Sequence, residues 1–314
     1  MTSFASGGLP LSVLIVLIGG CGQVPGRETL EEEEVQEELG PPFSLTVSDA
    51  GFSTPESVLH DPASDTYLVA NINGMAAEKD GNGFISRVSP QGVVLDLRWI
   101  DGSSSGVTLH APKGMAIVAD TLYVTDIDCV RRFNRVTGAP LLDLCLDEAT
   151  FLNDLTSSYR GGIYFSDSGT EGSPGAVYFL RPSADVPQVV TLADGTALSG
   201  VGLGGPNGLH DDQHGLFVAT FGSGELFRVN PKGERLQLLP PSGMGLDGIV
   251  SLGERGVLIS SWGDSAVYWI QPDGTVQPLL ENVEAPADLG YDAGRNRVLI
   301  PRFLANELTI LEVR

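Results

Sequence analysis

The sequence is poor in basic residues, with 18 Lys and Arg against 40 Asp and Glu and a formal net charge of −22. Residues 1–40 contribute −6 of this charge, and the rest of the chain contributes −16. A protein with this negative charge repels the phosphate backbone of nucleic acids, which argues against a nucleic-acid partner. The acidity fits instead a soluble, cation-binding protein that works outside the cytoplasm.

The apolar run near the N-terminus is short. Residues 9–18 are too few to cross a bilayer but match the hydrophobic region of an export signal. They lead into Leu17-Ile18-Gly19-Gly20-Cys21, which resembles a bacterial lipobox with cleavage before Cys21 and lipidation of its thiol. Residues 1–10 lack the Lys or Arg that such a signal normally carries. The alternative interpretation of this run is a buried strand.

We therefore predict three regions. Residues 1–20 are a signal peptide of the lipoprotein type, and residues 21–40 are an acidic linker too poor in apolar residues to form a core. Residues 41–314 form a single folded domain. We expect an exported monomer in the bacterial cell envelope, either lipid-anchored or periplasmic, that touches the membrane only through its N-terminal lipid anchor.

Cysteine is scarce, with three in the whole chain. Besides Cys21 there are Cys129 and Cys145, which stand at equal distances from Thr137 in a hairpin-like segment. A symmetric hairpin would place these two cysteines opposite each other, and an oxidising compartment would favour a disulfide between them. Two free buried thiols are the alternative.

Helix-like stretches are also few, whereas 40 Gly and 20 Pro favour an all-β fold with many tight turns. A short turn motif followed by two apolar strands recurs six times, at spacings of 57, 40, 54, 40 and 40 residues. A period of roughly 40–45 residues with several short strands is typical of a propeller blade. The sequence therefore predicts a six-bladed β-propeller. The equivalent anchor residues of the six repeats are Glu56, Lys113, Asn153, Asn207, Asp247 and Ala287.

The sixth repeat ends without a fourth strand, while an unassigned strand-like run, residues 43–47, precedes the first repeat. We predict that this run supplies the outer strand of the last blade and closes the ring, which would remove an exposed edge.

Equivalent residues of a propeller meet around its axis, so the anchors should form a ring. Two carboxylates, Glu56 and Asp247, and two amides, Asn153 and Asn207, would then offer oxygen ligands with a net charge of −2. Such ligands suit calcium, whereas zinc normally requires His or Cys. The alternative is that these side chains only pair with one another and with turn amides. The four histidines lie near anchors, and we expect them to occupy surface or strand positions rather than the site itself: His60, His110, His210 and His214.

These motifs resemble the senescence marker protein (regucalcin), gluconolactonase and luciferin-regenerating enzyme family over residues 43–314. The resemblance implies that Glu56 of a Pro-Glu motif, Asn207 of an Asn-Gly motif and Asp247 of an Asp-Gly motif hold a divalent metal. It also implies that Asn153, in Asn153-Asp154, lies beside metal and substrate, and that Glu171 contacts substrate.

The chain departs from the family at Phe151, where the family has a substrate-binding Arg, and this puts recognition of a polar sugar acid in doubt. Lys113 stands at an anchor, where it could contact substrate or pair with a carboxylate. We predict a metal-dependent hydrolase of a lactone or related cyclic ester, with Asp247 or Glu56 taking the proton of the attacking water. The rival prediction is a non-catalytic propeller that binds a ligand or partner around a structural calcium.

Overall fold

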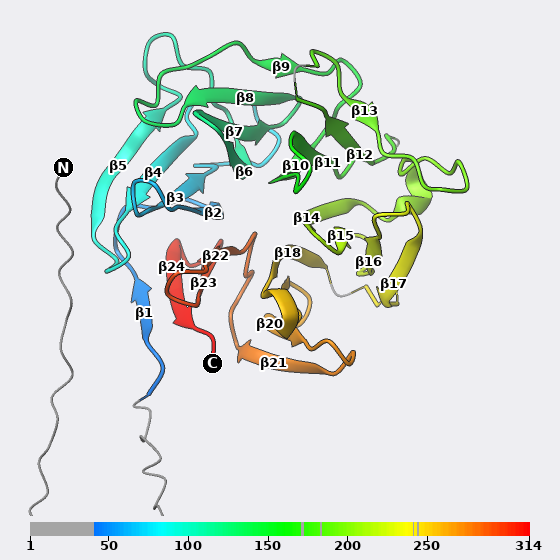
Figure 1. The fold of residues 1–314 in the computed structure, drawn as a ribbon. Helices are drawn as coiled ribbons and strands as arrows, with labels where there is room; N and C mark the ends of the chain where they lie inside the picture. The colour runs from blue at the N-terminus through cyan, green and yellow to red at the C-terminus, as the bar shows by residue number, and fades with distance from the viewer. Residues whose placement is uncertain (1–40, 171–172, 183, 241, 244) are drawn as a thin grey trace, which may run out of the picture. The chain divides into compact units, whose positions relative to one another are not determined.

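The computed structural model describes residues 41–314 except residues 171, 172, 183, 241 and 244. The predicted signal peptide, Cys21, the acidic linker and Glu171 lie outside the described residues. Residues 41–314 form six four-stranded antiparallel sheets around a common axis, which confirms the predicted six-bladed β-propeller (Figure 1).

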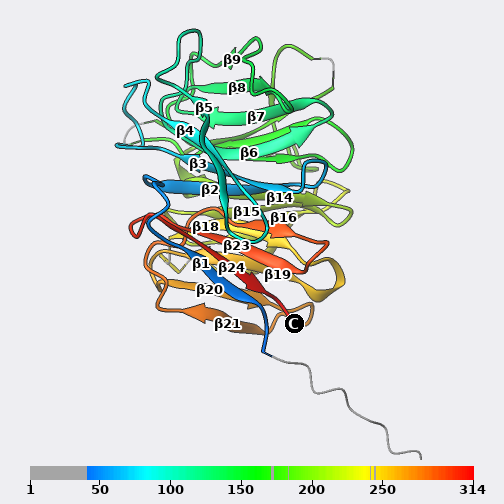
Figure 2. The same cartoon turned by 90° about the vertical axis from the view of Figure 1, so that its left-hand side faces the viewer.

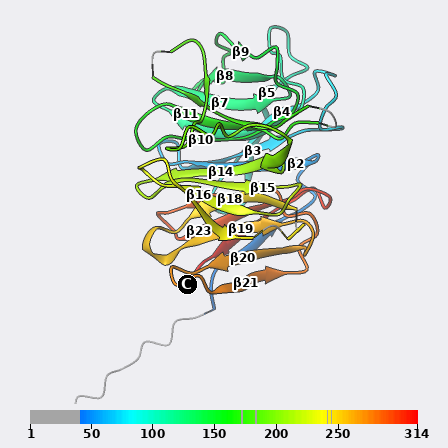
Figure 3. The same cartoon turned by 90° about the vertical axis from the view of Figure 1, so that its right-hand side faces the viewer.

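Each of the first five blades is built from four consecutive strands, with the first strand innermost (Figure 1). Blades 1 to 3 are β2(Pro55–Asp61), β3(Thr66–Asn71), β4(Phe84–Val88), β5(Val94–Asp101); β6(Pro112–Val118), β7(Thr121–Asp126), β8(Cys129–Asn134), β9(Leu144–Cys145); and β10(Leu152–Ser157), β11(Ile163–Asp167), β12(Ala176–Leu180), β13(Gln188–Val189). Blades 4 and 5, which are neighbours in Figure 3, are β14(Pro206–Asp212), β15(Gly215–Thr220), β16(Leu226–Val229), β17(Arg235–Leu239); and β18(Leu246–Ser251), β19(Val257–Ser261), β20(Ala266–Ile270), β21(Val276–Glu281).

The sixth blade joins the two ends of the domain, as predicted. It consists of β22(Gly290–Asp292), β23(Arg297–Arg302) and β24(Glu307–Glu312), followed by β1(Ser44–Val47) as its outermost strand. Strand β1 pairs antiparallel with β24, from Ser44 opposite Leu311 to Val47 opposite Leu308, and lies along it in Figure 2. Without β1, the backbone N–H and C=O groups of β24 would form an open sheet edge.

The hydrophobic core lies between the faces of neighbouring blades. One cluster combines Leu68 and Ile85 of blade 1 with Leu122 and Phe133 of blade 2, all 2% exposed or less. Because the second strand of each blade is covered on both faces, it reads as a short apolar run rather than as an alternating pattern. The helices in the described part of the chain are two 3-10 turns, η1(Val201–Leu203) and η2(Gly253–Arg255), and no described helix has the length and apolar character to cross a membrane.

Cys129 and Cys145 are joined by a disulfide. They are direct partners in the register between β8 and β9, the position expected from the symmetry of the hairpin. Strand β9 has only two residues and Cys145 is exposed, so the covalent bond fixes the short outer strand of blade 2.

Removal of the closure strand should destabilise the domain. We compare a chain beginning at Pro41 with one beginning at Asp49, which lacks β1. The shorter chain loses the ladder to β24 and the burial of Val47 against Leu308 and Ile310. We expect its melting temperature to fall by roughly 10 °C, as a loss of a few kcal/mol requires in a domain of this size. Equal melting temperatures, measured by circular dichroism, would contradict the closure role.

Residues 41–314 contain two cysteines, so a thiol assay of this domain is unambiguous. After secretion and unfolding without reductant, neither cysteine should react with maleimide. Closing a loop of about 15 residues stabilises a fold by about 3 kcal/mol in the chain-entropy model. We therefore expect Cys129→Ser with Cys145→Ser to lower the melting temperature. Two reactive thiols in the wild-type domain would show that the bond does not form.

Candidate functional site

Five of the six anchor residues are the second residue of their blade's inner strand, in β2, β6, β10, β14 and β18, and Ala287 lies three residues before β22. In β2, β6, β10, β14 and β18 the antiparallel register shifts at this point, for example between Pro112 and Met115. A register irregularity of this kind redirects side chains, and here it gives the anchors positions around the axis. All six are buried, with exposed fractions of 6% for Glu56, 1% for Lys113, 7% for Asn153, 3% for Asn207, 3% for Asp247 and 0% for Ala287.

Hydrogen bonds from blade to blade hold the anchor backbones. The hydroxyl of Ser57 donates to Lys113 O at 2.6 Å, that of Ser166 to Asn207 O at 2.8 Å, and that of Ser260 to Ala287 O at 2.9 Å. Two further bonds of this kind join Thr125 Oγ1 to Asn153 O and Asp288 N to Glu56 O. Five of the six anchor carbonyls therefore accept a hydrogen bond from the adjacent blade, and the side chains start from a rigid frame.

The glycines of the Asn207-Gly208 and Asp247-Gly248 motifs permit this close approach. A Cβ atom at Gly208 would lie 1.9 Å from Asp247 O, and one at Gly248 would lie 2.1 Å from Leu289 N. Any side chain at either position would separate the inner strands. The motif glycines are thus required for the close packing of the inner strands. The residue before each glycine can vary, and its side chain can contribute to a site.

Three anchor side chains leave a buried oxygen without a hydrogen-bond partner: Glu56 Oε2, Asn207 Oδ1 and Asp247 Oδ1. Asn153 donates from Nδ2 to Ser168 Oγ at 3.1 Å, so that its Oδ1 is the atom available to a ligand. An unpaired buried oxygen is costly, and a bound cation would satisfy it. The four residues fit a hard divalent cation because they offer oxygens alone and two of them are carboxylates.

Burial dominates the electrostatics of these groups. It raises the pKa of Glu56 well above its ordinary value, and the charge of Asp247 adds to this effect. Burial also raises the pKa of Asp247 to about 7, against the opposing effect of the neighbouring Trp262 indole. Lys113 shows the reverse, since burial lowers its pKa to about 8 despite the attraction of Glu56. Each charged form thus lacks the solvation that it would have in water.

Two further carboxyl groups lie beside the anchor ring. Asp154 and Asp288 each follow an anchor residue, and both are buried. Burial raises the pKa of each of them, and the other ring carboxylates add to the effect for Asp288. Asp154 accepts N–H bonds from Leu155 and Leu209, both at 2.5 Å. Four carboxyl groups and one amine are therefore buried together, and a bound cation would stabilise the ionised form of the carboxyl groups.

A cavity of about 430 Å³ opens over the anchor ring, at the end where the inner strands begin. Five of the six predicted site residues lie on its floor: Glu56, Lys113, Asn153, Asn207 and Asp247. The sixth, Glu171, lies outside the described residues. Phe151 also lines the cavity, and Lys113 Nζ lies 4.5 Å from the centre of its ring. Lys113 further donates to Ala111 O at 3.1 Å.

The sequence analysis missed the residues that form the wall above this floor. They include Ile72, Phe221, Trp262 and Phe303, each the first residue after the second strand of its blade. The register pairs the end of that strand with the residue before each anchor, as in Pro206 opposite Thr220. Counting one residue past each second strand in the repeat would have found them.

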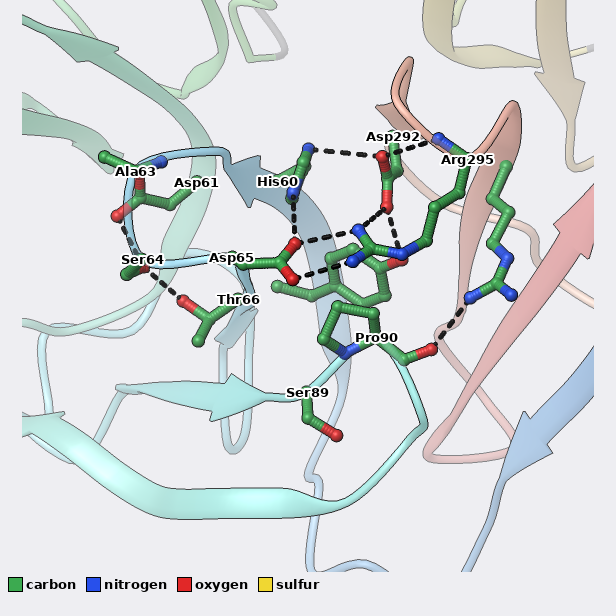
Figure 4. Close-up of polar contacts among 12 residues, drawn as sticks. His60, Asp61, Ala63, Ser64, Asp65, Thr66, Ser89, Pro90, Asp292 and Arg295 are labelled. Atoms are coloured by element: carbon green, nitrogen blue, oxygen red, sulfur yellow. Dashed lines mark hydrogen bonds and ion pairs between the residues drawn. The ribbon is translucent and has the colours of Figure 1, made fainter. Parts of the chain in front are cut away.

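A second group of possible metal ligands lies at the other end of the inner strands. His60, Asp65 and Asp292 come together there, and Arg295 binds both carboxylates, at 2.7 Å to Asp65 and 2.9 Å to Asp292 (Figure 4). Burial would raise the pKa of Asp292, but the bonds from Arg295 and Tyr67 outweigh it and lower the pKa. Because a guanidinium already neutralises these acids, this group is an ion-pair network between blades 1 and 6.

Comparisons with known proteins place the chain by its fold. No protein-family model matches the sequence, and no curated protein matches it. Among solved structures, a gluconolactonase from Xanthomonas campestris superposes with a TM-score of 0.63 at 19% identity, covering 88% of this chain and 91% of its own.

A calcium-binding protein, regucalcin, from Agrobacterium tumefaciens superposes with a TM-score of 0.60 at 16% identity, covering 86% of this chain and 95% of its own. Virginiamycin B lyase from Staphylococcus aureus superposes with a TM-score of 0.57 at 11% identity, covering 87% of this chain and 100% of its own. At such identities these similarities establish the propeller fold, and they support the resemblance to the regucalcin and gluconolactonase family at that level.

Proposed function

We propose that this protein is a divalent-cation-dependent hydrolase of a lactone or related cyclic ester, with Glu56, Asn153, Asn207 and Asp247 as the cation ligands and calcium as the cation. The observation that carries the proposal is the set of buried, unpartnered oxygens of Glu56, Asn207 and Asp247 on the floor of an open cavity. The fold shared with a gluconolactonase and with regucalcin supports it.

A divalent cation held by these ligands would polarise an ester carbonyl and stabilise the negative charge that develops on its oxygen. The protein itself supplies the base. Asp247 and Glu56 lie on the cavity floor, and either carboxylate can accept a proton as a water oxygen attacks the carbonyl carbon. The C–O bond of the ring then breaks, and the same proton passes to the departing alkoxide, which gives a hydroxy acid.

Lys113 and Asn153 would orient the substrate. Lys113 uses one N–H for Ala111 O, and its ammonium lies over the Phe151 ring, so that its position is fixed. Asn153 is held by Ser168. Glu171 remains part of the proposed substrate contacts. We further propose export, with lipid attachment at Cys21, which would hold a monomeric propeller at the cell envelope.

The first test is removal of one carboxylate at a time. Glu56→Gln and Asp247→Asn keep size but remove charge from a site where ligand charge sets affinity, so we expect calcium affinity to fall by roughly tenfold or more. Calcium should raise the melting temperature of the wild type by binding the folded form, and both variants should lose this shift. Isothermal titration calorimetry and thermal melts with calcium measure the two effects.

Glu284→Gln is the matched control, because Glu284 is an exposed carboxylate that does not line the cavity. It should retain calcium binding and hydrolysis. A wild type with no response to calcium, magnesium or manganese would overturn the cation site. Calcium binding without hydrolysis of any lactone or ester would instead favour a non-catalytic propeller.

Lys113 should behave differently from the carboxylates. Lys113→Met removes a positive charge that opposes a cation, so calcium binding should persist or tighten, while kcat falls because a substrate-orienting group is lost. Calorimetry and steady-state kinetics on the same preparation separate the two effects. A loss of calcium affinity as large as that of Asp247→Asn would mean that Lys113 maintains the anchor ring rather than contacting substrate.

A further inference from the structure

The wall of the cavity is itself a ring drawn from equivalent positions of the blades. The residue after the second strand of each blade is apolar in five of six cases. In blade order these residues are Ile72, Ile127, Ser168, Phe221, Trp262 and Phe303. The structure thus places an apolar ring directly above the polar anchor ring.

The aromatic members form a continuous surface. The ring centres of Phe221 and Trp262 lie 5.6 Å apart, and those of Trp262 and Phe303 lie 5.2 Å apart. Phe303 in turn packs against the cluster that contains Ile72, with Ala76 beside it. This wall runs from blade 4 through blade 6 to blade 1, and Phe151 of blade 3 adds another ring to the cavity lining.

Part of this surface faces open space. Phe221 is 40% exposed, and Trp262 and Phe303, which line the same cavity, are partly exposed. The indole N–H of Trp262 lies beside the Asp247 carboxyl. Aromatic rings left accessible around a concave site are typical of a small-molecule pocket.

Polar groups that could bind a polyol are few in the described wall. Its described side-chain hydroxyls are those of Ser168 and Thr170, and Ser168 is engaged with Asn153 and with Pro206 O at 2.8 Å. A site that selects a sugar needs several convergent donors and acceptors, because the sugar hydroxyls lose their water on binding. The wall offers apolar contact instead.

We infer that the substrate carries an apolar group, an alkyl chain or an aromatic ring, attached to the lactone or cyclic ester, and that the ring of Ile72, Phe221, Trp262 and Phe303 binds it. This inference rests on the proposed hydrolase function. The reacting carbonyl would lie toward the anchor ring, and the apolar substituent would extend along the aromatic wall.

The test uses the calcium-loaded protein and a series of γ-lactones, namely butyrolactone, heptalactone and nonalactone, with glucono-δ-lactone as the polar comparison. Each buried methylene should raise kcat/KM roughly fourfold. Nonalactone should therefore be the best of the series, and glucono-δ-lactone should be poor. Equal rates along the series, or a preference for glucono-δ-lactone, would overturn the inference while leaving the hydrolase proposal in place.

Binding of a ketone that cannot be hydrolysed distinguishes the two proposals. By calorimetry, 2-heptylcyclopentanone should bind more tightly than cyclopentanone, and it should change the fluorescence of Trp262. If it binds in this way and no lactone is hydrolysed, the hydrolase proposal fails and the apolar site stands. If neither ketone binds, the inference fails whatever the activity.

The Phe221→Ser variant tests whether the apolar wall causes the preference for long lactones. Phe221 is exposed enough for the fold to tolerate this change. We expect KM for nonalactone to rise roughly tenfold with kcat little altered, KM for butyrolactone to change much less, and Phe221→Leu to recover most of the loss. Leu142→Ser, at an apolar residue 82% exposed that does not line the cavity, is the control and should match the wild type. Equal losses on both lactones would indicate a structural role and contradict the inference.

Discussion

The structure depends on the closure of six sheets around one axis, where five of the six anchor carbonyls accept a hydrogen bond from the adjacent blade. Hydroxyl groups of Ser57, Ser166 and Ser260 donate to anchor carbonyls of the next blade, and Asp288 N of blade 6 donates to Glu56 O of blade 1. These bonds require close backbone approach, which Gly208 and Gly248 allow. The strand β1 completes the last sheet, so that the ring has no open junction.

This closure forces charged side chains into a buried space. Glu56, Asp154, Asp247 and Asp288 lie there with Lys113 as the opposing charge. Such a group is unfavourable for folding by itself, because burial disfavours every charged form and like charges repel. A cation at the axis, as proposed above, would offset this cost and pair with the three unpartnered oxygens.

Two rings of different character follow from the same symmetry. The anchor positions carry polar ligands, and the positions that end the second strands carry apolar side chains. One layer suits a cation and a reacting carbonyl, and the next suits the rest of a substrate. Phe151 and the aromatic wall give the cavity an apolar lining beside its polar floor.

The sequence alone determined the six blades, the closure by residues 43–47 and the polar anchor ring, because each is a local pattern repeated at a fixed period. Opposition of Cys129 and Cys145 also followed from one hairpin. Only the tertiary structure showed the unpaired oxygens at the axis, the neighbouring Asp154 and Asp288, and the aromatic wall. Phe221, Trp262 and Phe303 stand about 40 residues apart in the chain and meet only because ring closure converts equal steps in sequence into adjacency in space.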